Sequence, residues 1–287
     1  MKPKNTAVLL ILCPDKDGIV AETTALLARL GANIVYLDQH TDYESRMFFM
    51  RLEWDLENFS VNMDDFNTIF THETAKKFKM TWELHKSNTR QKTAIFVSKY
   101  AHCFFDILSR WKIKEFAVDI PLIISNHEDL REEAARFEIP FFHIPITKEN
   151  YEEQTLNQIE LLQKHDIDFV ILARYMQIIP PKMIEIYKNR IINIHHSFLP
   201  GFPGAKPYHQ AFERGVKIIG ATAHFVTEEL DAGPIISQDI QRVSHKHSVE
   251  DLIAAGRDIE RRVLANAVKA HIERKVLTYG NRTVVFS

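Results

Sequence analysis

The chain has 287 residues, of which 45% are hydrophobic and 26% charged, so it is long enough for two domains with sizeable cores. Its formal net charge is −2 without long runs of one sign, which argues against nucleic acid or an anionic membrane as the main partner and favours a small molecule. With two cysteines only, Cys13 and Cys103, we expect no disulfide framework and predict a reducing compartment, the cytoplasm.

The apolar run at residues 7–12 is similar to the core of a signal peptide, but no small-residue cleavage site follows it. We therefore interpret it as a first strand. No apolar stretch approaches the roughly 20 residues that a membrane-spanning helix needs.

Residues 6–86 alternate between apolar runs and helical spacing in the order strand, helix, strand, strand, helix, strand. We expect strands at 6–12, 32–38, 46–54 and 80–84, and helices at 18–30 and 63–78. This order is the split βαβ arrangement of ferredoxin-like folds.

Three segments of this unit resemble those of ACT domains, namely Cys13-Pro14-Asp15-Lys16-Asp17-Gly18-Ile19-Val20, Gly31-Ala32-Asn33-Ile34 and Arg46-Met47-Phe48-Phe49-Met50-Arg51. The resemblance implies a unit that binds an amino acid or another small effector at a dimer interface, and hence a homodimer or homotetramer. A dimerisation unit without a ligand is the alternative. The candidate effector-binding residues are Asp15, Asp17, Gly18 and Asn33.

A short polar segment at residues 87–92 is typical of a linker, so we place one domain at 1–86 and the other at 93–287. Beyond the linker, strands and helices alternate. The strands are expected at 93–97, 115–124, 141–144 and 168–172, followed by a last strand that leads into Asn193, and the helices at 101–111, 128–137, 151–164 and 182–187. This alternation predicts an α/β domain with a doubly wound, mostly parallel sheet and with ligands at the carboxyl ends of its strands.

The segment after the first of these strands, Val97-Ser98-Lys99-Tyr100-Ala101-His102-Cys103, contains no glycine. A phosphate-binding loop at this position is normally rich in glycine. Its absence argues against NAD, ATP and phosphorylated acceptors.

The last strand of the alternation leads through Asn193 and His195 into a loop rich in proline and glycine. Because side chains alternate along a strand, these two residues are expected on one face and His196 on the other, in a structural role. By themselves, Asn193 could cap a turn and His195 could be a partly buried histidine. Further along, residues 220–226 predict a strand that carries His224, followed by a turn that carries Asp231.

Together, Asn193-x-His195, His224 and Asp231 resemble the catalytic set of the folate-dependent formyltransferase fold. The wider resemblance is to the formyltetrahydrofolate deformylase family, and it spans nearly the whole chain. It is carried by residues 99–103, 172–176, 191–200, 204–211, 214–217, 220–226 and 279–283. It implies hydrolysis of 10-formyltetrahydrofolate to formate and tetrahydrofolate, with the folate as substrate and with no cofactor and no metal.

The resemblance assigns roles that the chemistry requires. Asn193 would donate its amide N–H to the developing oxyanion, and His195 would be the general acid/base. Asp231 would orient or deprotonate the attacking water and stabilise charge on His195, and His224 would support Asp231.

The resemblance also implies a folate-binding set, consisting of Asn126, Met176, Gln177, Ile178, Ile179 and Lys206. By composition alone the apolar members are more typical of a core than of a binding site, and Lys206 could meet either a glutamate carboxylate or solvent.

Three other functions remain open at this point. The same residues could serve a transferase that moves the formyl group to an amine. A metal hydrolase is conceivable, although the spacing of His195, His196, His224 and Asp231 matches no standard zinc pattern. The protein could also be a regulator that binds folate without turning it over.

Overall fold

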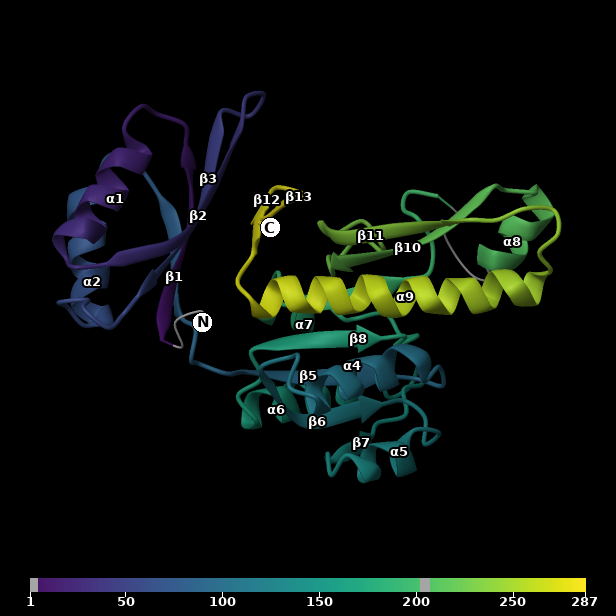
Figure 1. Ribbon diagram of the computed structural model, residues 1–287. Helices are drawn as coiled ribbons and strands as arrows, with labels where there is room; N and C mark the ends of the chain where they lie inside the picture. The colour runs from purple at the N-terminus through teal and green to yellow at the C-terminus, as the bar shows by residue number, and fades with distance from the viewer. Residues whose placement is uncertain (1–4, 202–206) are drawn as a thin grey trace. The chain divides into compact units, whose positions relative to one another are not determined.

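The computed structural model describes residues 5–201 and 207–287 and divides the chain into two compact units (Figure 1). The first unit runs to Arg90 and also includes Glu273–Tyr279 and Val284–Ser287. The second unit comprises Gln91–Ile272 and Gly280–Thr283. The predicted domains, 1–86 and 93–287, therefore differ from the observed units mainly in the assignment of the C-terminal segment.

The first unit has the predicted βαββαβ order. Its four antiparallel strands lie in the order β2-β3-β1-β4. They are β1 (Thr6–Pro14), β2 (Asn33–Asp42), β3 (Met47–Asp55) and β4 (Thr81–Lys86), and the helical segments are α1 (Ile19–Arg29), α2 (Met63–Phe70), η1 (Thr71–Ala75) and α3 (Lys76–Phe78). The ferredoxin-like fold of this unit is confirmed.

The two faces of this sheet are covered by different parts of the chain. Alternate residues of β1, Leu9 and Ile11, point to the face that α1 and α2 cover, where they join a core with Trp54 and Phe66. Val8 and Leu10 of β1 pack on the opposite face against Leu277 and Phe286. Leu277 lies in the C-terminal strand β12 (Val276–Tyr279), and Phe286 follows the last strand, β13 (Arg282–Val285). The end of the chain thus completes the first unit.

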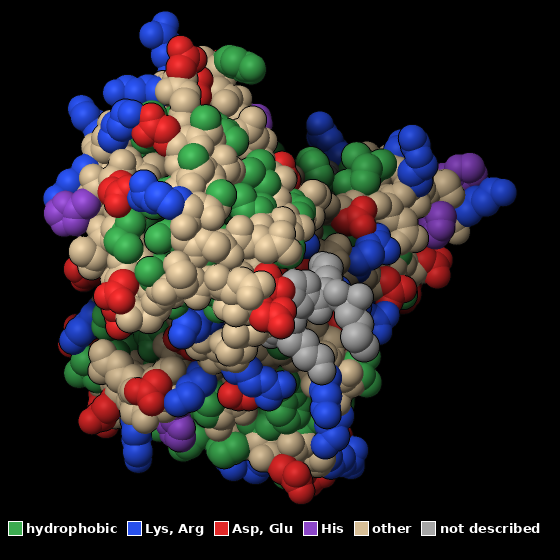
Figure 2. Space-filling view, turned by 60° about the vertical axis from the view of Figure 1, so that its left-hand side comes forward, with side chains coloured by type: hydrophobic (Ala, Val, Ile, Leu, Met, Phe, Trp, Pro, Cys, Tyr) green, Lys and Arg blue, Asp and Glu red, His purple; other side chains and the backbone are tan. Residues whose placement is uncertain are grey.

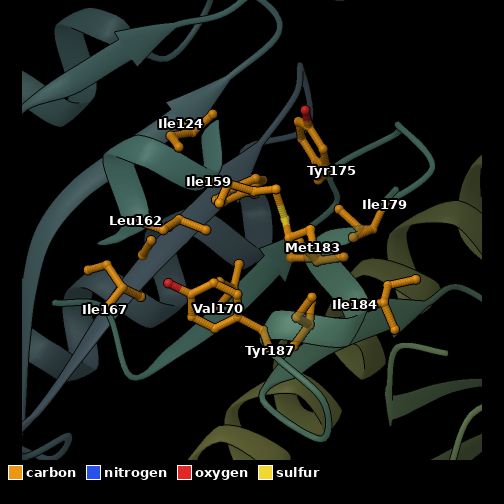
Figure 3. Close-up of a cluster of buried hydrophobic side chains, with 14 of the residues drawn as sticks. Ile124, Ile159, Leu162, Ile167, Val170, Tyr175, Ile179, Met183, Ile184 and Tyr187 are labelled. Atoms are coloured by element: carbon orange, nitrogen blue, oxygen red, sulfur yellow. The ribbon is translucent and has the colours of Figure 1, made fainter. Parts of the chain in front are cut away.

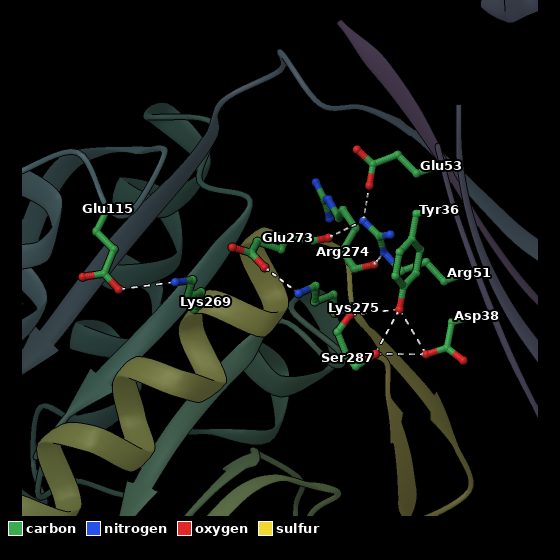
Figure 4. Close-up of polar contacts among 10 residues, drawn as sticks. All are labelled: Tyr36, Asp38, Arg51, Glu53, Glu115, Lys269, Glu273, Arg274, Lys275 and Ser287. Atoms are coloured by element: carbon green, nitrogen blue, oxygen red, sulfur yellow. Dashed lines mark hydrogen bonds and ion pairs between the residues drawn. The ribbon is translucent and has the colours of Figure 1, made fainter. Parts of the chain in front are cut away.

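A buried arginine holds this C-terminal segment in place (Figure 4). Arg51 donates from Nε to the Arg274 carbonyl at 3.0 Å and from Nη2 to the Glu273 carbonyl at 3.2 Å, and it forms an ion pair with Glu53 at 2.9 Å. These partners lie more than 200 residues from Arg51, apart from Glu53. Local periodicity cannot reveal such a contact, which explains why the predicted domain boundaries missed it.

The second unit contains a seven-stranded sheet in the order β11-β10-β9-β8-β5-β6-β7. The strands β5 (Gln91–Val97), β6 (Val118–Ser125), β7 (Phe141–His143), β8 (Phe169–Ala173) and β9 (Ile191–His195) are parallel, whereas β10 (Ile218–Phe225) and β11 (Ile235–Arg242) are antiparallel to their neighbours. The doubly wound, mostly parallel sheet is confirmed.

Six helices of this unit lie within the described residues: α4 (His102–Lys112), α5 (Arg131–Arg136), α6 (Tyr151–Lys164), α7 (Pro181–Ile186), α8 (Pro207–Arg214) and α9 (Val249–Ile272). The 24-residue α9 was not among the predicted elements. Its start does carry a local signal, because the Ser248 and Asp251 side chains each accept a hydrogen bond from the other's backbone N–H. Helix α9 contacts β9, β10 and β11, the three strands at one side of the sheet. The candidate site described below lies on these strands.

A large apolar core fixes the strands on which that site depends (Figure 3). Val170 of β8 and Leu162 of α6 are buried there together with Met183 and Ile184 of α7. Tyr175 and Ile179, from the loop after β8, belong to the same core. The β8–α7 loop is therefore anchored at two points.

None of the described helices is both long enough and apolar enough to cross a membrane. On the face drawn in Figure 2, basic and acidic side chains are interspersed.

We predict that Arg51→Met lowers the free energy of unfolding of the first unit by about 3 kcal/mol, because two backbone carbonyls and the Glu53 carboxylate lose the buried Arg51 as their donor. Arg29→Met is the matched control: Arg29 forms an exposed ion pair with Glu73, and its loss should cost less than about 1 kcal/mol. Urea unfolding followed by the fluorescence of Trp54 and Trp82 measures both. Equal losses in the two variants would contradict the anchoring role of Arg51.

Candidate active site

The site begins at the carboxyl end of β9, where two neighbouring strands place polar side chains opposite each other. In the antiparallel pairing of β9 with β10, His224 faces Asn193 and Thr222 faces His195. The Asn193 amide Nδ2 lies 3.3 Å from His224 Nε2. The structure thus brings the predicted Asn193, His195 and His224 together, as strand alternation and pairing require.

Asp231 completes the group from the turn between β10 and β11. Its carboxylate lies 3.1 Å from His195 Nδ1 and 3.6 Å from His224 Nε2. Asp231 has a left-handed φ of 55°, which is uncommon for a residue with a side chain. Gly233 allows the turn to close, since a Cβ there would lie 1.8 Å from the Phe225 carbonyl oxygen.

The two histidines determine the charge of this carboxylate. Burial alone would raise the pKa of Asp231, but its contacts with His195 and His224 hold that pKa well below its usual range. Asp231 is therefore ionised at any working pH.

The same contacts orient the imidazole rings. Because His195 Nδ1 faces the Asp231 carboxylate, Nδ1 carries the proton and Nε2 is left as the basic nitrogen. Nε2 is buried and has no hydrogen-bond partner among the described residues. His224 Nδ1 donates to the Phe225 carbonyl at 2.9 Å, so its Nε2 faces both Asn193 and Asp231.

These four residues line a pocket of about 580 Å³. Four of the predicted folate-binding residues, Met176, Gln177, Ile178 and Ile179, line it as well. Met176 and Ile178 are 52% and 66% exposed, so they offer apolar surface at the mouth. Lys206 lies outside the described residues.

Asn126 is not among the residues that line this pocket, and the folate contact predicted for it stays a prediction. It is buried, and its Oδ1 accepts a hydrogen bond from Ser98 Oγ at 2.6 Å. Ser98 Oγ in turn accepts one from the Met176 N–H at 3.0 Å. Through Ser98, Asn126 therefore supports the backbone of the β8–α7 loop at Met176.

His196 departs from the alternation prediction. Its ring centroid lies 5.1 Å from that of His195, and it lines the same pocket. Strand β9 ends at His195, so alternation no longer applies at the next residue. Burial, reinforced by the charge of Arg174, lowers the pKa of His196 from 6.5 to about 4.

Other residues line the pocket that sequence reasoning did not assign to the site, among them Tyr100, His102, Arg174, Tyr208 and Glu260. They come from the β5–α4 loop, the start of α4, the residue after β8, α8 and α9. Their proximity depends on tertiary packing, and α9 was not predicted.

The effector candidates lie in the first unit at two separate places. Asp15, Asp17 and Gly18 follow the end of β1 at Pro14, which pairs with Met47. Asn33 pairs with Asp55, which also pairs with Thr6 at the other end of β1. A nine-residue strand is roughly 25 Å long, so these two places cannot share one site within one chain.

The metal-hydrolase alternative finds no support in the grouping of ligand atoms. Within the parts of the chain that the structure describes, one group of three potential ligands is close enough to hold an ion, and it consists of His102, Cys103 and Glu260. Of the four ligands considered from the sequence, His195, His224 and Asp231 bind one another instead. Burial also keeps Cys103 in its thiol form by raising its pKa.

Comparisons with known proteins agree with this architecture. The formyl transferase family model matches residues 91–268, and the ACT domain model matches residues 7–53. The formyltetrahydrofolate deformylase of Synechocystis sp. is 50% identical over 98% of this chain and 99% of its own, and that of Bacillus subtilis is 46% identical over 97% and 93%.

Solved structures give the same result. The crystal structure of a formyltetrahydrofolate deformylase from Pseudomonas syringae pv. tomato superimposes with a TM-score of 0.97 at 45% identity, covering 100% of this chain and 96% of that chain. A phosphoribosylglycinamide formyltransferase from Bacillus halodurans superimposes with a TM-score of 0.60 at 29% identity, covering 64% of this chain and 96% of that chain.

We predict that His196 makes stability depend on pH. Its pKa in the folded chain is below that of the unfolded chain, so the unfolded state takes up the proton first. Stability is then complete above pH 6.5 and falls towards pH 4, by at most about 1.4 kcal/mol per pH unit. Urea midpoints should fall less steeply over this range in His196→Asn. An unchanged slope would show that His196 is not the responsible group.

Proposed function

The chain belongs to the formyltetrahydrofolate deformylase family, and on this premise we propose that Asn193, His195, Asp231 and His224 carry out its reaction. The reaction is the hydrolysis of 10-formyltetrahydrofolate to formate and tetrahydrofolate. The observation that carries the assignment is the basic Nε2 of His195, which has no partner among the described residues, in a pocket where Asp231 holds the other ring nitrogen.

In the proposed mechanism, His195 Nε2 takes a proton from a water molecule as the water oxygen bonds to the formyl carbon. The Asp231 carboxylate stabilises the imidazolium that forms, across the 3.1 Å contact with Nδ1. An ionised Asp231 is needed for this step, which fits its lowered pKa.

Asn193 serves the oxygen of the formyl group. An amide carries two N–H donors, and one of them faces His224 Nε2 at 3.3 Å. The other can donate to the oxyanion of the tetrahedral intermediate. His224 contacts both Asn193 and Asp231 and thereby fixes their separation.

Collapse of the intermediate breaks the bond between the formyl carbon and N10. N10 keeps the electron pair and takes the proton from His195, which returns the imidazole to its starting state. The other product is formic acid, which loses its own proton to water as formate. No metal or cofactor enters these steps, and we propose that none is required.

We propose that the folate lies across the loop Met176–Ile179. The exposed Met176 and Ile178 offer apolar contact to a flat ring system. Ile179 anchors the loop in the core, and Ser98 and Asn126 hold its backbone. Such a rigid loop can present the formyl carbon to His195 in a fixed orientation.

Hydrolysis is favoured over transfer to an amine because the full-length relatives are named deformylases. The segment after β5 also lacks the glycines that a phosphorylated acceptor would need. The free thiols of Cys13 and Cys103 fit the proposed cytoplasmic location.

We predict that wild-type protein releases formate from 10-formyltetrahydrofolate without any added amine, and that Asp231→Asn lowers kcat about a thousand-fold or more while folate still binds. Asn193→Ala should lower kcat by about a hundred- to a thousand-fold. Glu229→Gln, a change of an exposed carboxylate on the same turn, is the control and should leave kcat unchanged. Unchanged turnover in Asp231→Asn would remove that residue from the mechanism, and wild-type protein that releases no formate would refute hydrolysis.

The ACT domain is the proposed effector site, formed between two chains of a homodimer or homotetramer. The turn at Asp15, Asp17 and Gly18 is exposed, and so is Asn33. Since a single chain separates these two places, a second chain could bring them together. Glycine and methionine are the proposed effectors.

We predict that glycine or methionine raises the midpoint of thermal unfolding in a concentration-dependent manner. Leucine is the control amino acid. Asp17→Asn should weaken the shift without changing the midpoint of the free protein, because Asp17 is exposed. No shift with either amino acid would favour an ACT domain that serves dimerisation only.

A further inference from the structure

Beyond His196 the pocket is lined by a connected set of side chains that the proposed mechanism does not use. We call Tyr100, His102, Arg174, Tyr208 and Glu260 the ionic cluster. They come from five different segments of the chain, and all of them line the same pocket as His195 and Asp231.

Glu260 of α9 is the centre of the ionic cluster. Its side chain is almost inaccessible, with the residue only 1% exposed. One carboxylate oxygen accepts from Tyr208 Oη at 2.7 Å, and the other lies 2.8 Å from His102 Nε2 and 3.5 Å from Arg174 Nε. A buried carboxylate with three partners ties their three elements into one rigid unit.

Arg174 contacts both the Glu260 carboxylate and the ring of Tyr100. Its guanidinium carbon lies 4.9 Å above the ring of Tyr100, and its side chain is only 9% exposed. Its backbone has a left-handed φ of 64°, a conformation that glycine adopts without strain. A large side chain at such a position indicates that the space it fills matters more than the backbone strain.

Tyr208 lies on the side of the ionic cluster that faces His196. Its ring centroid lies 6.3 Å from that of His196, which in turn lies 5.1 Å from that of His195. Gly256 of α9 makes room for it, because a Cβ there would lie 2.2 Å from Tyr208 Oη. The ionic cluster therefore reaches the neighbourhood of the catalytic base through one intervening ring.

We propose that the ionic cluster blocks the side of the pocket from which an amine would approach the formyl carbon, so that water is the only acceptor. The proposal rests on the proposed function. A formyltransferase of this fold needs room for an amine beside its catalytic base. In this chain that side of the pocket is lined by groups whose charges and hydrogen bonds are directed at one another.

Removal of the ionic cluster would let an amine react with the formyl group. A primary amine would attack the formyl carbon in place of water, the bond between that carbon and N10 would break, and N10 would take the proton that the amine loses. The products would be an N-formyl amine and tetrahydrofolate. Water and amine would then compete, and the ratio of the two products would measure access.

The test uses the full-length double variant Arg174→Gly/Glu260→Gln. Glycine suits the left-handed backbone at 174, and the second change avoids a buried unpaired carboxylate. Wild-type and variant proteins are incubated with 10-formyltetrahydrofolate and excess glycinamide, and both formate and N-formylglycinamide are quantified. Arg274→Gly is the matched control, because it makes the same change at another left-handed arginine, in the first unit.

We expect wild type and Arg274→Gly to yield formate only, and the double variant to raise the ratio of N-formylglycinamide to formate on the order of ten-fold or more above background. A folded double variant that still yields formate alone would overturn the proposal. So would a wild-type protein that formylates glycinamide as readily as the variant, or a folded variant without any turnover, since the cluster would then belong to the chemistry itself.

Tyr100→Ala is the second variant, in case the double variant fails to fold. Tyr100 is 46% exposed and supports Arg174 from outside, so its removal should open the same route with little effect on stability. Formate alone from this variant would then count against the proposal. Failure of the proposed function itself is distinguishable, because wild-type protein without amine would release no formate.

Discussion

The contact between the Asp231 carboxylate and His195 Nδ1 is the interaction on which the site depends. It decides which ring nitrogen of His195 is basic, and it keeps a negative charge beside the imidazolium that forms during turnover. The contact exists only if β9 and β10 keep their register, since a slip of one residue would move His224 to the other face of the sheet. Helix α9 packs against β9, β10 and β11, and so contributes to this register.

The pocket contains a second carboxylate in a contrasting environment. Glu260, like Asp231, has a lowered pKa although burial alone would raise it, and in both cases hydrogen bonds and nearby positive charge outweigh burial. The partners of Glu260 are directed inwards and bind elements together. The Asp231 carboxylate holds His195 Nδ1 and so leaves the basic Nε2 of His195 without a hydrogen-bond partner among the described residues. The same type of charge therefore serves rigidity at one end of the pocket and reactivity at the other.

The positions of site residues could be predicted from the sequence where a single strand or turn determines them. Alternation along a single strand places Asn193 beside His195, and the parallel sheet places both at its carboxyl edge. The prediction that Asp231 lies beside these two residues came from the family resemblance, because no local sequence pattern determines where a turn 36 residues after His195 lies. The folate contact predicted for Asn126 stays a prediction, because a buried amide that supports a loop and one that meets a ligand have the same sequence signal. Glu260 and the C-terminal contacts of Arg51 could not be predicted, because they are made between segments far apart in the chain.

Two residues that line the pocket have an unfavourable backbone conformation. Asp231 and Arg174 both have left-handed φ angles, 55° and 64°, and each costs roughly 1–2 kcal/mol for a residue with a Cβ. Arg174 follows directly after the end of β8, and Asp231 lies in the turn between β10 and β11. The surrounding contacts offset this strain: two histidines hold Asp231, and Glu260 with the ring of Tyr100 holds Arg174. Because both charges depend on strained turns held by side chains, loss of one partner should let the turn relax and move its charge, so that errors in positioning would spread from the supporting residues to the chemistry.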